Sequence, residues 1–404
     1  MVLSLEAIGQ PGPGDVFREY AWIPHMIKSE TGKFLRVGGN LDYRNNPTHL
    51  PPEFHRDGYI SFGHYLQLDQ AIKAELVLEK VASHEDTKGL RVSINQNTAI
   101  QIPAAKGIPE PEADYMHHTY PVTPIPLSEL REGWDNSFQL EVDTAQRWNW
   151  PQNLIYGVIL RVYYQPETAQ SKAEITGINN GDALGRKVIL EISDPDQSIR
   201  QVDYLGLYEG INYEGDGIYR QWHYHYLRGN IKHHLGTAMD YPYKLNWNTE
   251  WVPDQQEPLQ IAARIVDNTG LIYFTAAVTG LSFDRDFRVA LGKPYNQPKN
   301  WVTREGEFQE KIDLKTNPER ITDARLIWVS WSPCYTNGVF VNQKQVLDKE
   351  GPCYDYMAHN VPFDPALLKS GTNVISTGKE PLHDGNMVHG MEVQWPGIML
   401  LIRY

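Results

Sequence analysis

The sequence of 404 residues has no excess of positive charge and lacks the motifs of nucleotide chemistry. Its 50 Asp and Glu residues outnumber 37 Lys and Arg residues, which gives a net charge of −13 at pH 7. Contact with nucleic acid needs a concentrated basic face, so this balance argues against a nucleic-acid partner. The sequence also lacks a Gly-x-Ser-x-Gly elbow, a phosphate-binding Gly-x-x-x-x-Gly-Lys loop and a dinucleotide fingerprint after a strand.

Long apolar segments are absent as well. No stretch approaches the roughly 18 uninterrupted apolar residues of a membrane-spanning helix, so we expect no membrane span. The first ten residues, Met1 to Gln10, have neither the basic start nor the apolar region of a secretory signal. The protein is therefore either cytoplasmic or exported by a signal that this chain does not carry.

Cysteine is scarce, with two residues in the chain, Cys334 and Cys353, each next to a proline in a turn-rich stretch. Paired, they would close a loop whose constraint is worth roughly 3 kcal/mol, and they would favour an oxidising compartment. As two unrelated free thiols they would do neither. The spacing alone leaves both alternatives open.

Phenylalanine is sparse beside the other aromatic residues: the chain has 23 Tyr and 11 Trp but only 11 Phe. Tyr and Trp combine an apolar ring with a polar tip, which suits half-exposed binding surfaces. They are also favoured in strands, so a large β protein needs many of them. The aromatic excess fits a binding surface and an ordinary all-β fold equally.

An internal repeat organises the chain. Residues 71–164 and 321–404 share five features in the same order: an alternating strand, a Thr-x-Gly turn before a strand ending in Asn, Asp-Tyr-Met-x-His, Leu-x-x-Gly followed by Asn, and Trp-Pro before a final apolar strand. The last feature lies at Trp150-Pro151 and Trp395-Pro396. Short strands, turn residues and Pro-rich connections predict an all-β unit.

The Asp-Tyr-Met-x-His segments begin at Asp114 and Asp355, one in each copy of the repeat. A feature present in both copies is more easily explained by a shared fold than by one active site. We therefore interpret these residues as turn and core residues.

The Leu-x-x-Gly-x-Asn turn between two strands resembles the galactose-binding-like jelly rolls found beside or within carbohydrate-active enzymes. In that turn the leucine is an apolar anchor and the glycine takes a positive φ. The resemblance implies two related jelly-roll β-sandwich domains, at residues 1–170 and 291–404.

The unit between them, residues 171–290, has a different signature. Its Pro242-Tyr243 to Thr249 segment and its Ala263 to Gly270 segment resemble the Pro-Tyr-x-x-x-Trp-x-Thr and Ala-x-x-x-Asp-x-x-Gly signatures of bacterial immunoglobulin-like domains. The whole chain resembles three-domain exported bacterial proteins with galactose-binding-like jelly rolls flanking such a domain. The expected fold is thus all-β, with two related jelly rolls flanking an immunoglobulin-like sandwich. Fold alone says little about function.

Residues 208–236 form a long insertion in this middle unit, where a typical immunoglobulin-like domain has a short turn. The insertion holds four of the 14 histidines, several carboxylates and a dense set of Tyr and Trp. Loops carried on a rigid sandwich are common places for binding and catalysis. Three interpretations are open.

In the first, the insertion binds a divalent metal as cofactor. In a strand, the alternation of His223-Tyr224-His225 would put both imidazoles on one face. A further histidine from a neighbouring strand would complete a three-histidine site with an open position. The predicted ligands are His223, His225 and His234.

In the second interpretation, aromatic rings stack on sugar faces while charged side chains hydrogen-bond to hydroxyl groups. The predicted substrate-binding residues are Tyr208, Tyr213, Tyr219, Arg220, Trp222 and Tyr226. In the third, the same residues pack the insertion against its neighbours, and the histidines are satisfied in a domain interface.

Acid–base catalysis needs two carboxylates, or a carboxylate and a histidine, with separated pKa values. Glycoside hydrolysis needs two carboxyl groups that face each other across the bond. Taken singly, each carboxylate of this chain is more commonly a solvated or capping group. The predicted catalytic residues are His223, Glu214, Asp216, Glu392 and His389.

We therefore predict a secreted or periplasmic protein whose partner is a poly- or oligosaccharide. The enzyme form of this prediction is a glycoside hydrolase or polysaccharide lyase that uses a carboxylate or histidine of the insertion. The alternative is a non-catalytic carbohydrate-binding protein, or a self-assembling surface or fibre protein in which the aromatics form contacts within a homo-oligomer.

Overall fold

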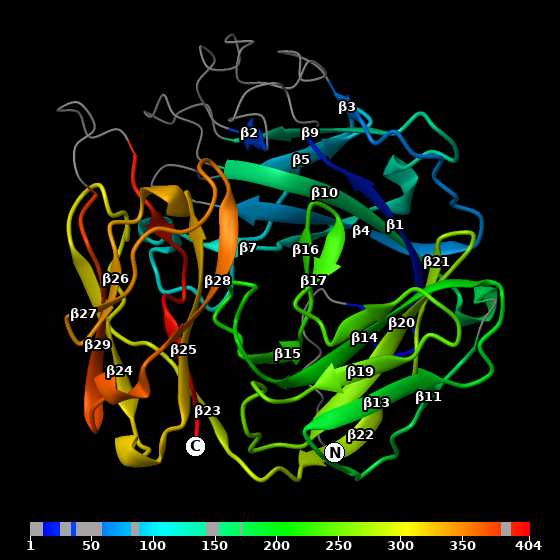
Figure 1. Ribbon diagram of the computed structural model, residues 1–404. Helices are drawn as coiled ribbons and strands as arrows, with labels where there is room; N and C mark the ends of the chain where they lie inside the picture. The colour runs from blue at the N-terminus through cyan, green and yellow to red at the C-terminus, as the bar shows by residue number, and fades with distance from the viewer. Residues whose placement is uncertain are drawn as a thin grey trace.

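The computed structural model describes residues 11–24, 34–37, 59–81, 89–142, 153–169, 172–380 and 389–404. In these ranges the chain is all-β, as the sequence predicts, and the helical elements are three-residue 3₁₀ turns such as Leu127–Glu129 and Pro365–Leu367. The strands build three sandwiches that meet around a central hairpin (Figure 1). No helix of the described ranges is long and apolar enough to cross a membrane.

The first sandwich packs two sheets against each other. One sheet contains β1 (Val16–Trp22), β2 (Leu35–Val37), β4 (Ala71–Val81), β7 (His118–Thr119), β8 (Val122–Ile125) and β10 (Asn153–Tyr164). The other contains β3 (Ile60–Ser61), β5 (Arg91–Ile94), β6 (Ile100–Gln101) and β9 (Ser137–Glu141).

Strand β10 is buried along its whole length because its two faces cover different cores. Val158 and Leu160 face the core of the first sandwich. Ile159 and Tyr163 pack on the opposite face, in a cluster with Trp222 of the insertion. The near-continuous apolar sequence of this strand reflects burial on both faces.

The middle sandwich also has two layers. The larger contains β12 (Ala183–Leu184), β14 (Ile199–Glu209), β15 (Arg220–Trp222), β18 (Gly236–Ala238), β20 (Leu259–Asp267), β21 (Leu271–Phe274) and β22 (Val278–Phe283). The smaller contains β11 (Ile175–Thr176), β13 (Lys187–Ile192) and β19 (Leu245–Asn248). Tyr204 and Trp247 lie in its core.

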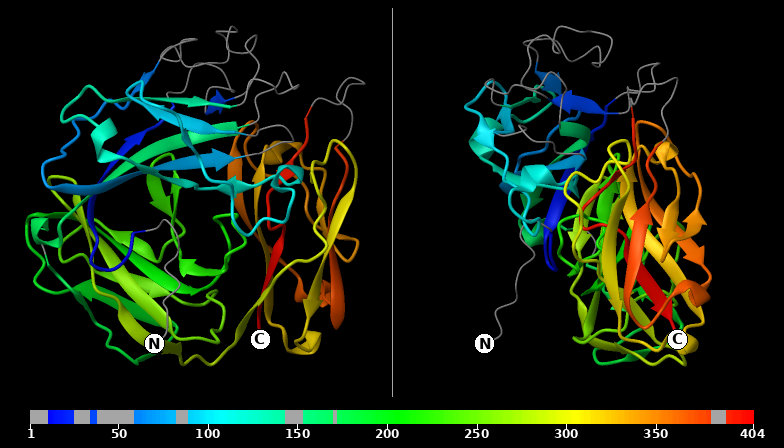
Figure 2. Two further views of the ribbon diagram at one scale, coloured as in Figure 1. Left: turned by 180° about the vertical axis from the view of Figure 1, so that it is seen from behind. Right: turned by 90° about the vertical axis from the view of Figure 1, so that its left-hand side faces the viewer.

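The third sandwich, yellow to red in Figure 2, lies beside the other two. One sheet contains β23 (Val289–Gly292), β25 (Asp323–Trp331), β28 (Tyr356–Phe363), β30 (Glu392–Val393) and β31 (Met399–Arg403). The other contains β24 (Phe308–Leu314), β26 (Val339–Val341), β27 (Lys344–Leu347) and β29 (Gly371–Thr377). Because β23 pairs with β31, the boundary predicted after residue 290 falls inside a strand of this sandwich.

Strand β1 joins the first and middle sandwiches into one 13-stranded sheet. Along one edge it pairs with β10, from Val16 opposite Tyr164 to Trp22 opposite Val158. Along its other edge it pairs with β21, where Arg18 lies opposite Leu271. The two sandwiches are therefore held together by backbone hydrogen bonds as well as by side-chain packing.

The two segments of the predicted repeat make the same hydrogen bonds around a pair of asparagines. The Nδ2 of Asn95 donates to Oδ1 of Asn136 at 2.9 Å, and the Nδ2 of Asn342 donates to Oδ1 of Asn373 at 2.8 Å. Asn95 and Asn342 both have positive φ, at 50° and 47°. These matched bonds support the predicted repeat, although Trp150-Pro151, one of its features, lies outside the described residues.

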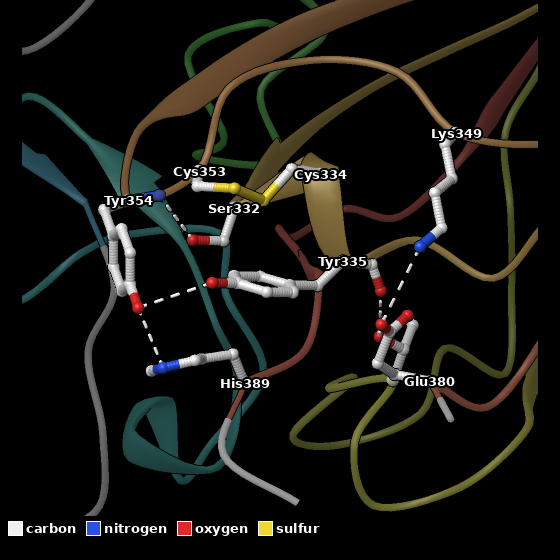
Figure 3. Close-up of a disulfide and its surroundings, with 9 residues drawn as sticks. Ser332, Cys334, Tyr335, Lys349, Cys353, Tyr354, Glu380 and His389 are labelled. Atoms are coloured by element: carbon white, nitrogen blue, oxygen red, sulfur yellow. Dashed lines mark hydrogen bonds and ion pairs between the residues drawn. A yellow bond between two sulfur atoms is a disulfide. The ribbon is translucent and has the colours of Figure 1, made fainter. Parts of the chain in front are cut away.

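Cys334 and Cys353 form a disulfide, so the paired alternative is correct (Figure 3). The disulfide closes the connection between β25 and β28. Two tyrosines next to the cysteines, Tyr335 and Tyr354, come together there with their hydroxyls 3.3 Å apart. The Tyr354 hydroxyl also lies 2.8 Å from Nε2 of His389.

Replacing both cysteines by serine is expected to lower the free energy of unfolding by about 3 kcal/mol, because the unfolded chain regains the closed loop. Urea unfolding of the purified double variant, compared with the oxidised wild type, measures this difference. The wild type unfolded in the presence of a thiol reductant should lose a similar amount. Equal midpoints for oxidised and reduced protein would contradict the stabilising role.

Candidate functional site

The insertion folds into a hairpin whose tip lies where the three sandwiches meet. Its strands are β16 (His225–Leu227) and β17 (Asn230–Lys232). The two turn residues, Arg228 and Gly229, have φ values of 49° and 74°, which a two-residue β-hairpin turn of the primed type requires. The glycine supplies one of these positions without strain.

Arg228 connects the hairpin tip to both outer sandwiches. Its backbone N–H donates to Oε2 of Glu79 in β4 at 2.7 Å. Its Nη2 donates to both carboxylate oxygens of Asp355, at 2.7 and 2.8 Å. The hydroxyl of Tyr356, at the start of β28, donates to the other oxygen of Glu79. Burial raises the pKa of Glu79 to about 7.

Three histidines lie together beside this contact. Nδ1 of His233 is 3.0 Å from Nε2 of His225, and the ring of His118 lies 5.9 Å from that of His225. Tyr213 stacks on His233 with ring centroids 3.7 Å apart. Burial lowers the pKa of His118 to about 3, so this ring is neutral at pH 7, whereas His233 lies at the exposed edge of the cluster. Their packed interface matches the third interpretation of the insertion.

The predicted metal site of His223, His225 and His234 is wrong. The chain leaves β15 after Trp222 and enters β16 at His225, so the alternation expected of one continuous strand does not hold. Nε2 of His223 lies 2.8 Å from the Tyr208 carbonyl, and Nε2 of His234 lies 2.7 Å from the Thr237 hydroxyl. Among the residues that the structure describes, no three His, Cys, Asp or Glu side chains could hold a metal ion together.

Two of the predicted substrate-binding residues, Trp222 and Tyr226, are buried in a hydrophobic cluster between the sandwiches. Trp222 meets Phe274 edge to face, with ring centroids 5.3 Å apart. The Tyr226 hydroxyl donates to Glu19 and accepts from Nη2 of Arg161 at 2.7 Å. These two are structural residues, and their prediction as substrate contacts is wrong.

The other predicted substrate-binding residues also contact protein groups. The Tyr208 ring lies 4.4 Å from that of His223, and the Lys293 ammonium lies 4.1 Å above the Tyr219 ring. Arg220 pairs with Glu257 at 3.1 Å. Tyr213 belongs to the histidine cluster. These four side chains are therefore spread around the insertion, each in contact with other protein groups.

The predicted catalytic residues separate into two places. In the insertion, Oε1 of Glu214 lies 3.7 Å from Nδ1 of His223, and both side chains are buried. No hydrogen bond from the described residues reaches either oxygen of Glu214. Asp216 accepts from Nδ2 of Asn212 at 2.6 Å and from the Ile218 N–H at 2.9 Å, which are the contacts of a turn carboxylate. Burial, together with repulsion from Glu214, raises the pKa of Asp216 to about 6.

Glu392 and His389 lie in the third sandwich. Glu392 is buried on β30, with Nη1 of Arg304 at 3.9 Å, and burial raises its pKa to about 7. His389 lies beside the disulfide, where its ring stacks against Tyr335 at 5.0 Å (Figure 3). The structure thus joins Glu214 with His223, but it shows no described contact between that pair and Glu392 or His389.

An open cavity of about 410 Å³ lies between β1 of the first sandwich and β14 and β20 of the middle sandwich, next to the hairpin. We call it the β1–β14 cavity. Charged and amide side chains line much of it: Arg18, Glu19, Arg200, Asp203, Asn230 and Arg264. A second cavity of about 630 Å³, lined by residues 21–24 and 59–64, shares Ala21 and His64 with the first.

A buried ion network forms the floor of the β1–β14 cavity. Arg264 Nη2 lies 2.7 Å from Oε2 of Glu19, and its Nη1 lies 3.1 Å from Oδ2 of Asp203. Arg161 adds a second cation, with its Nε 3.1 Å from Oε1 of Glu19. Burial alone would raise the pKa of Glu19, but Arg264 and Arg161 outweigh it and hold the pKa below its usual value. Glu19 is therefore ionised at neutral pH.

Glu19, Asp203 and Arg264 are not among the site residues predicted from the sequence, although the sequence holds a signal for two of them. Asp203 and Arg264 lie opposite each other on β14 and β20, each as the one charged residue of a largely apolar stretch, residues 202–207 and 261–266. Charged residues are almost never fully buried unless they are paired. One charge in the middle of each of two apolar stretches therefore indicates a buried pair.

Neither a known protein family nor a curated protein matches the sequence. Among solved structures, the chain is similar to BuGH86 in complex with neoagarooctaose, with 14% identity, 55% of this chain and 34% of that chain covered, and a TM-score of 0.24. It is also similar to BpGH86A, a β-porphyranase of glycoside hydrolase family 86 from the human gut bacterium Bacteroides plebeius, with 13% identity, 58% and 37% coverage, and a TM-score of 0.23.

The fibronectin(III)-like modules of Clostridium thermocellum CbhA match with 10% identity, 52% of this chain and 98% of that chain covered, and a TM-score of 0.18. The chain spans about a third of the length of the two glycoside hydrolase structures. TM-scores at this level do not establish a common arrangement of strands. We therefore transfer no residue role from these proteins.

Proposed function

We propose that the protein binds an oligosaccharide or a segment of a polysaccharide in the β1–β14 cavity. The observation that carries this proposal is a cavity of about 410 Å³ whose polar side chains are held in place by a buried ion network. Its volume lies within the range of small-molecule sites. Sugars present many hydroxyl groups, which fixed charged and amide groups recognise by hydrogen bonds.

Two further features support a sugar as ligand. The half-buried ring of His64 lines the cavity, 5.9 Å from the buried ring of Tyr20, and a ring offers an apolar face to a pyranose. The adjoining second cavity extends the open space beyond His64. An elongated ligand of several sugar units fits two connected cavities better than a compact metabolite does.

Binding without catalysis is the form of this function that the described cavity supports. A general acid needs a pKa near the working pH. Glu79, Asp216 and Glu392 have such pKa values, but they do not line the β1–β14 cavity. Glu19 does line the cavity, and it is ionised. Glycoside hydrolase or lyase activity stays a prediction from the sequence. The disulfide supports a secreted or periplasmic location, because such bonds persist in oxidising compartments.

Asn230→Trp is expected to weaken saccharide binding at least tenfold, because Asn230 is an exposed residue lining the cavity and an indole there would occupy the space of a sugar unit. Binding is measured by calorimetry against a panel of poly- and oligosaccharides. The matched control is Asn97→Trp, an exposed loop residue of the first sandwich away from the cavity lining.

The same incubations, followed by mass spectrometry, test for cleavage. Release of new oligosaccharides by the wild type would establish an enzyme and overturn the non-catalytic form of the proposal. If the wild type binds no saccharide on the panel, or if Asn230→Trp binds as the wild type does, the cavity is not the binding site.

A further inference from the structure

The β1–β14 cavity contains more positive charge than its internal ion pairs use. Three arginines and two carboxylates line it. Arg264 is matched by Glu19 and Asp203. Arg18 and Arg200 make no ion pair with a carboxylate of the described residues. In a chain with a net charge of −13, this is a local excess of cationic groups.

Arg18 is held in a fixed orientation. It lies on β1, and its guanidinium donates from Nη1 to the Thr269 carbonyl and from Nη2 to the Thr269 hydroxyl at 3.0 Å. Those contacts are to neutral oxygens, so the positive charge of Arg18 is positioned without being neutralised. A guanidinium has five N–H donors, and two bonds leave others for a ligand.

Arg200 lies on the opposite side of the Thr269–Gly270 turn. It is the extra residue where the pairing of β14 with β20 shifts register, between Ile199 and Gln201. Such bulges change the direction of a side chain. Arg200 is exposed and lines the cavity.

The nearest carboxylate of the turn, Asp267, does not neutralise either arginine. Its Oδ1 accepts the N–H and hydroxyl of Thr269, at 2.8 and 2.7 Å, and the Leu271 N–H at 2.9 Å. It therefore holds the turn between β20 and β21. Thr269 of this turn then holds Arg18 by accepting a hydrogen bond from its guanidinium.

We propose that the β1–β14 cavity selects acidic saccharides, with Arg18 and Arg200 binding the carboxylate or sulfate groups of the sugar. This inference rests on the proposed saccharide binding and names its ligand class. The planar guanidinium matches a carboxylate or sulfate with two parallel hydrogen bonds. Glu19 and Asn230 remain to bind hydroxyl groups, which acidic and neutral sugars share.

The test compares three ligands of equal length by calorimetry: a neutral gluco-oligosaccharide, an oligogalacturonide and a sulfated galacto-oligosaccharide. The wild type is expected to bind at least one acidic ligand tenfold or more tightly than the neutral one. The two acidic ligands distinguish carboxylate from sulfate recognition. Raising the NaCl concentration from about 0.05 M to about 0.5 M should reduce this preference, because salt screens exposed charges.

Arg200→Gln is expected to lower the affinity for the acidic ligand about tenfold and the affinity for the neutral ligand much less, because only the acidic ligand loses a charged partner. Arg200→Glu should lower the acidic affinity further. Because the Arg200 side chain is exposed and makes no hydrogen bond or ion pair with the described residues, these variants are expected to fold. Arg131→Gln, an exposed arginine of the first sandwich outside the cavity lining, is the matched control.

The inference is overturned if neutral and acidic ligands bind equally. It is also overturned if Arg200→Gln and Arg200→Glu leave the acidic affinity unchanged. Either result leaves the proposed saccharide binding intact. If none of the three ligands, nor any on the wider panel, binds, the proposed function fails and the inference fails with it. Tighter acidic binding that is weakened by both Arg200 variants and by salt supports it.

Discussion

Arg264→Met is expected to lower the free energy of unfolding by about 3–5 kcal/mol, which is the cost of leaving buried charges without their partner. The Arg264 guanidinium pairs with Glu19 at 2.7 Å and with Asp203 at 3.1 Å, and Arg264 and Asp203 are only 3% and 0% exposed. Methionine keeps much of the volume but removes the charge. Asp203 then has no described cation, and Glu19 keeps Arg161 alone.

Urea unfolding at neutral pH measures the difference between wild type and variant. The control is the triple variant Glu19→Gln, Asp203→Asn, Arg264→Met, which removes Arg264 and both of its partners together and leaves Arg161 paired with Glu75. It should recover most of the lost stability, because replacing a buried ion pair as a whole is often close to neutral. A loss below about 1 kcal/mol for Arg264→Met alone would show that water reaches the network, since exposed pairs contribute that little.

Glu79→Gln is expected to remove a pH dependence from the stability of the three-sandwich junction. Burial raises the pKa of Glu79 to about 7 in the folded protein, above its ordinary value of 4.5. Between those values the folded state holds a proton that the unfolded state releases, so stability falls as the pH rises from about 4.5 to about 7. The glutamine amide keeps the hydrogen-bonding oxygen and cannot ionise.

Relative to the Gln variant, the wild type should lose about 1.4 kcal/mol per pH unit in this window, about 3 kcal/mol in all, and no more above pH 7. Urea unfolding of both proteins at several pH values between 4.5 and 8 gives the difference. Other shifted groups, such as Glu392, are common to both proteins and cancel. Glu167→Gln, an exposed carboxylate, should follow the wild type throughout. A constant difference between wild type and Glu79→Gln would contradict the raised pKa.

The features that the sequence predicts correctly depend on residues close together in the chain. Period-two patterns and turn residues predict the all-β fold, and the Leu-x-x-Gly turns predict positive φ at Gly133 and Gly371, which have φ values of 105° and 78°. Each of these signals lies within a few residues, because side-chain alternation and turn conformation are local properties.

The candidate site was not predictable in the same way. The composition of the insertion indicated a site made of its own histidines and aromatics, yet the tertiary structure buries most of them against the outer sandwiches. The predicted metal site requires one continuous strand from Trp222 through His225, so that His223 and His225 share a face. The chain instead breaks between β15 and β16, which separates the two histidines. Packing against all three sandwiches determines that break.

The sequence by itself determined the strand-forming segments, the matched turns of the repeat and the presence of two cysteines that could pair. Tertiary structure alone decided that β1 pairs with β21 and that Arg264 meets Glu19 across 245 positions of sequence. It also decided that a polar cavity lies between β1 and the strands β14 and β20. The physical reason is that the residues near a strand edge or a buried charge in the sequence do not specify which distant segment will pair with it. Which edge is covered, and which charge is neutralised, depends on the whole chain being folded.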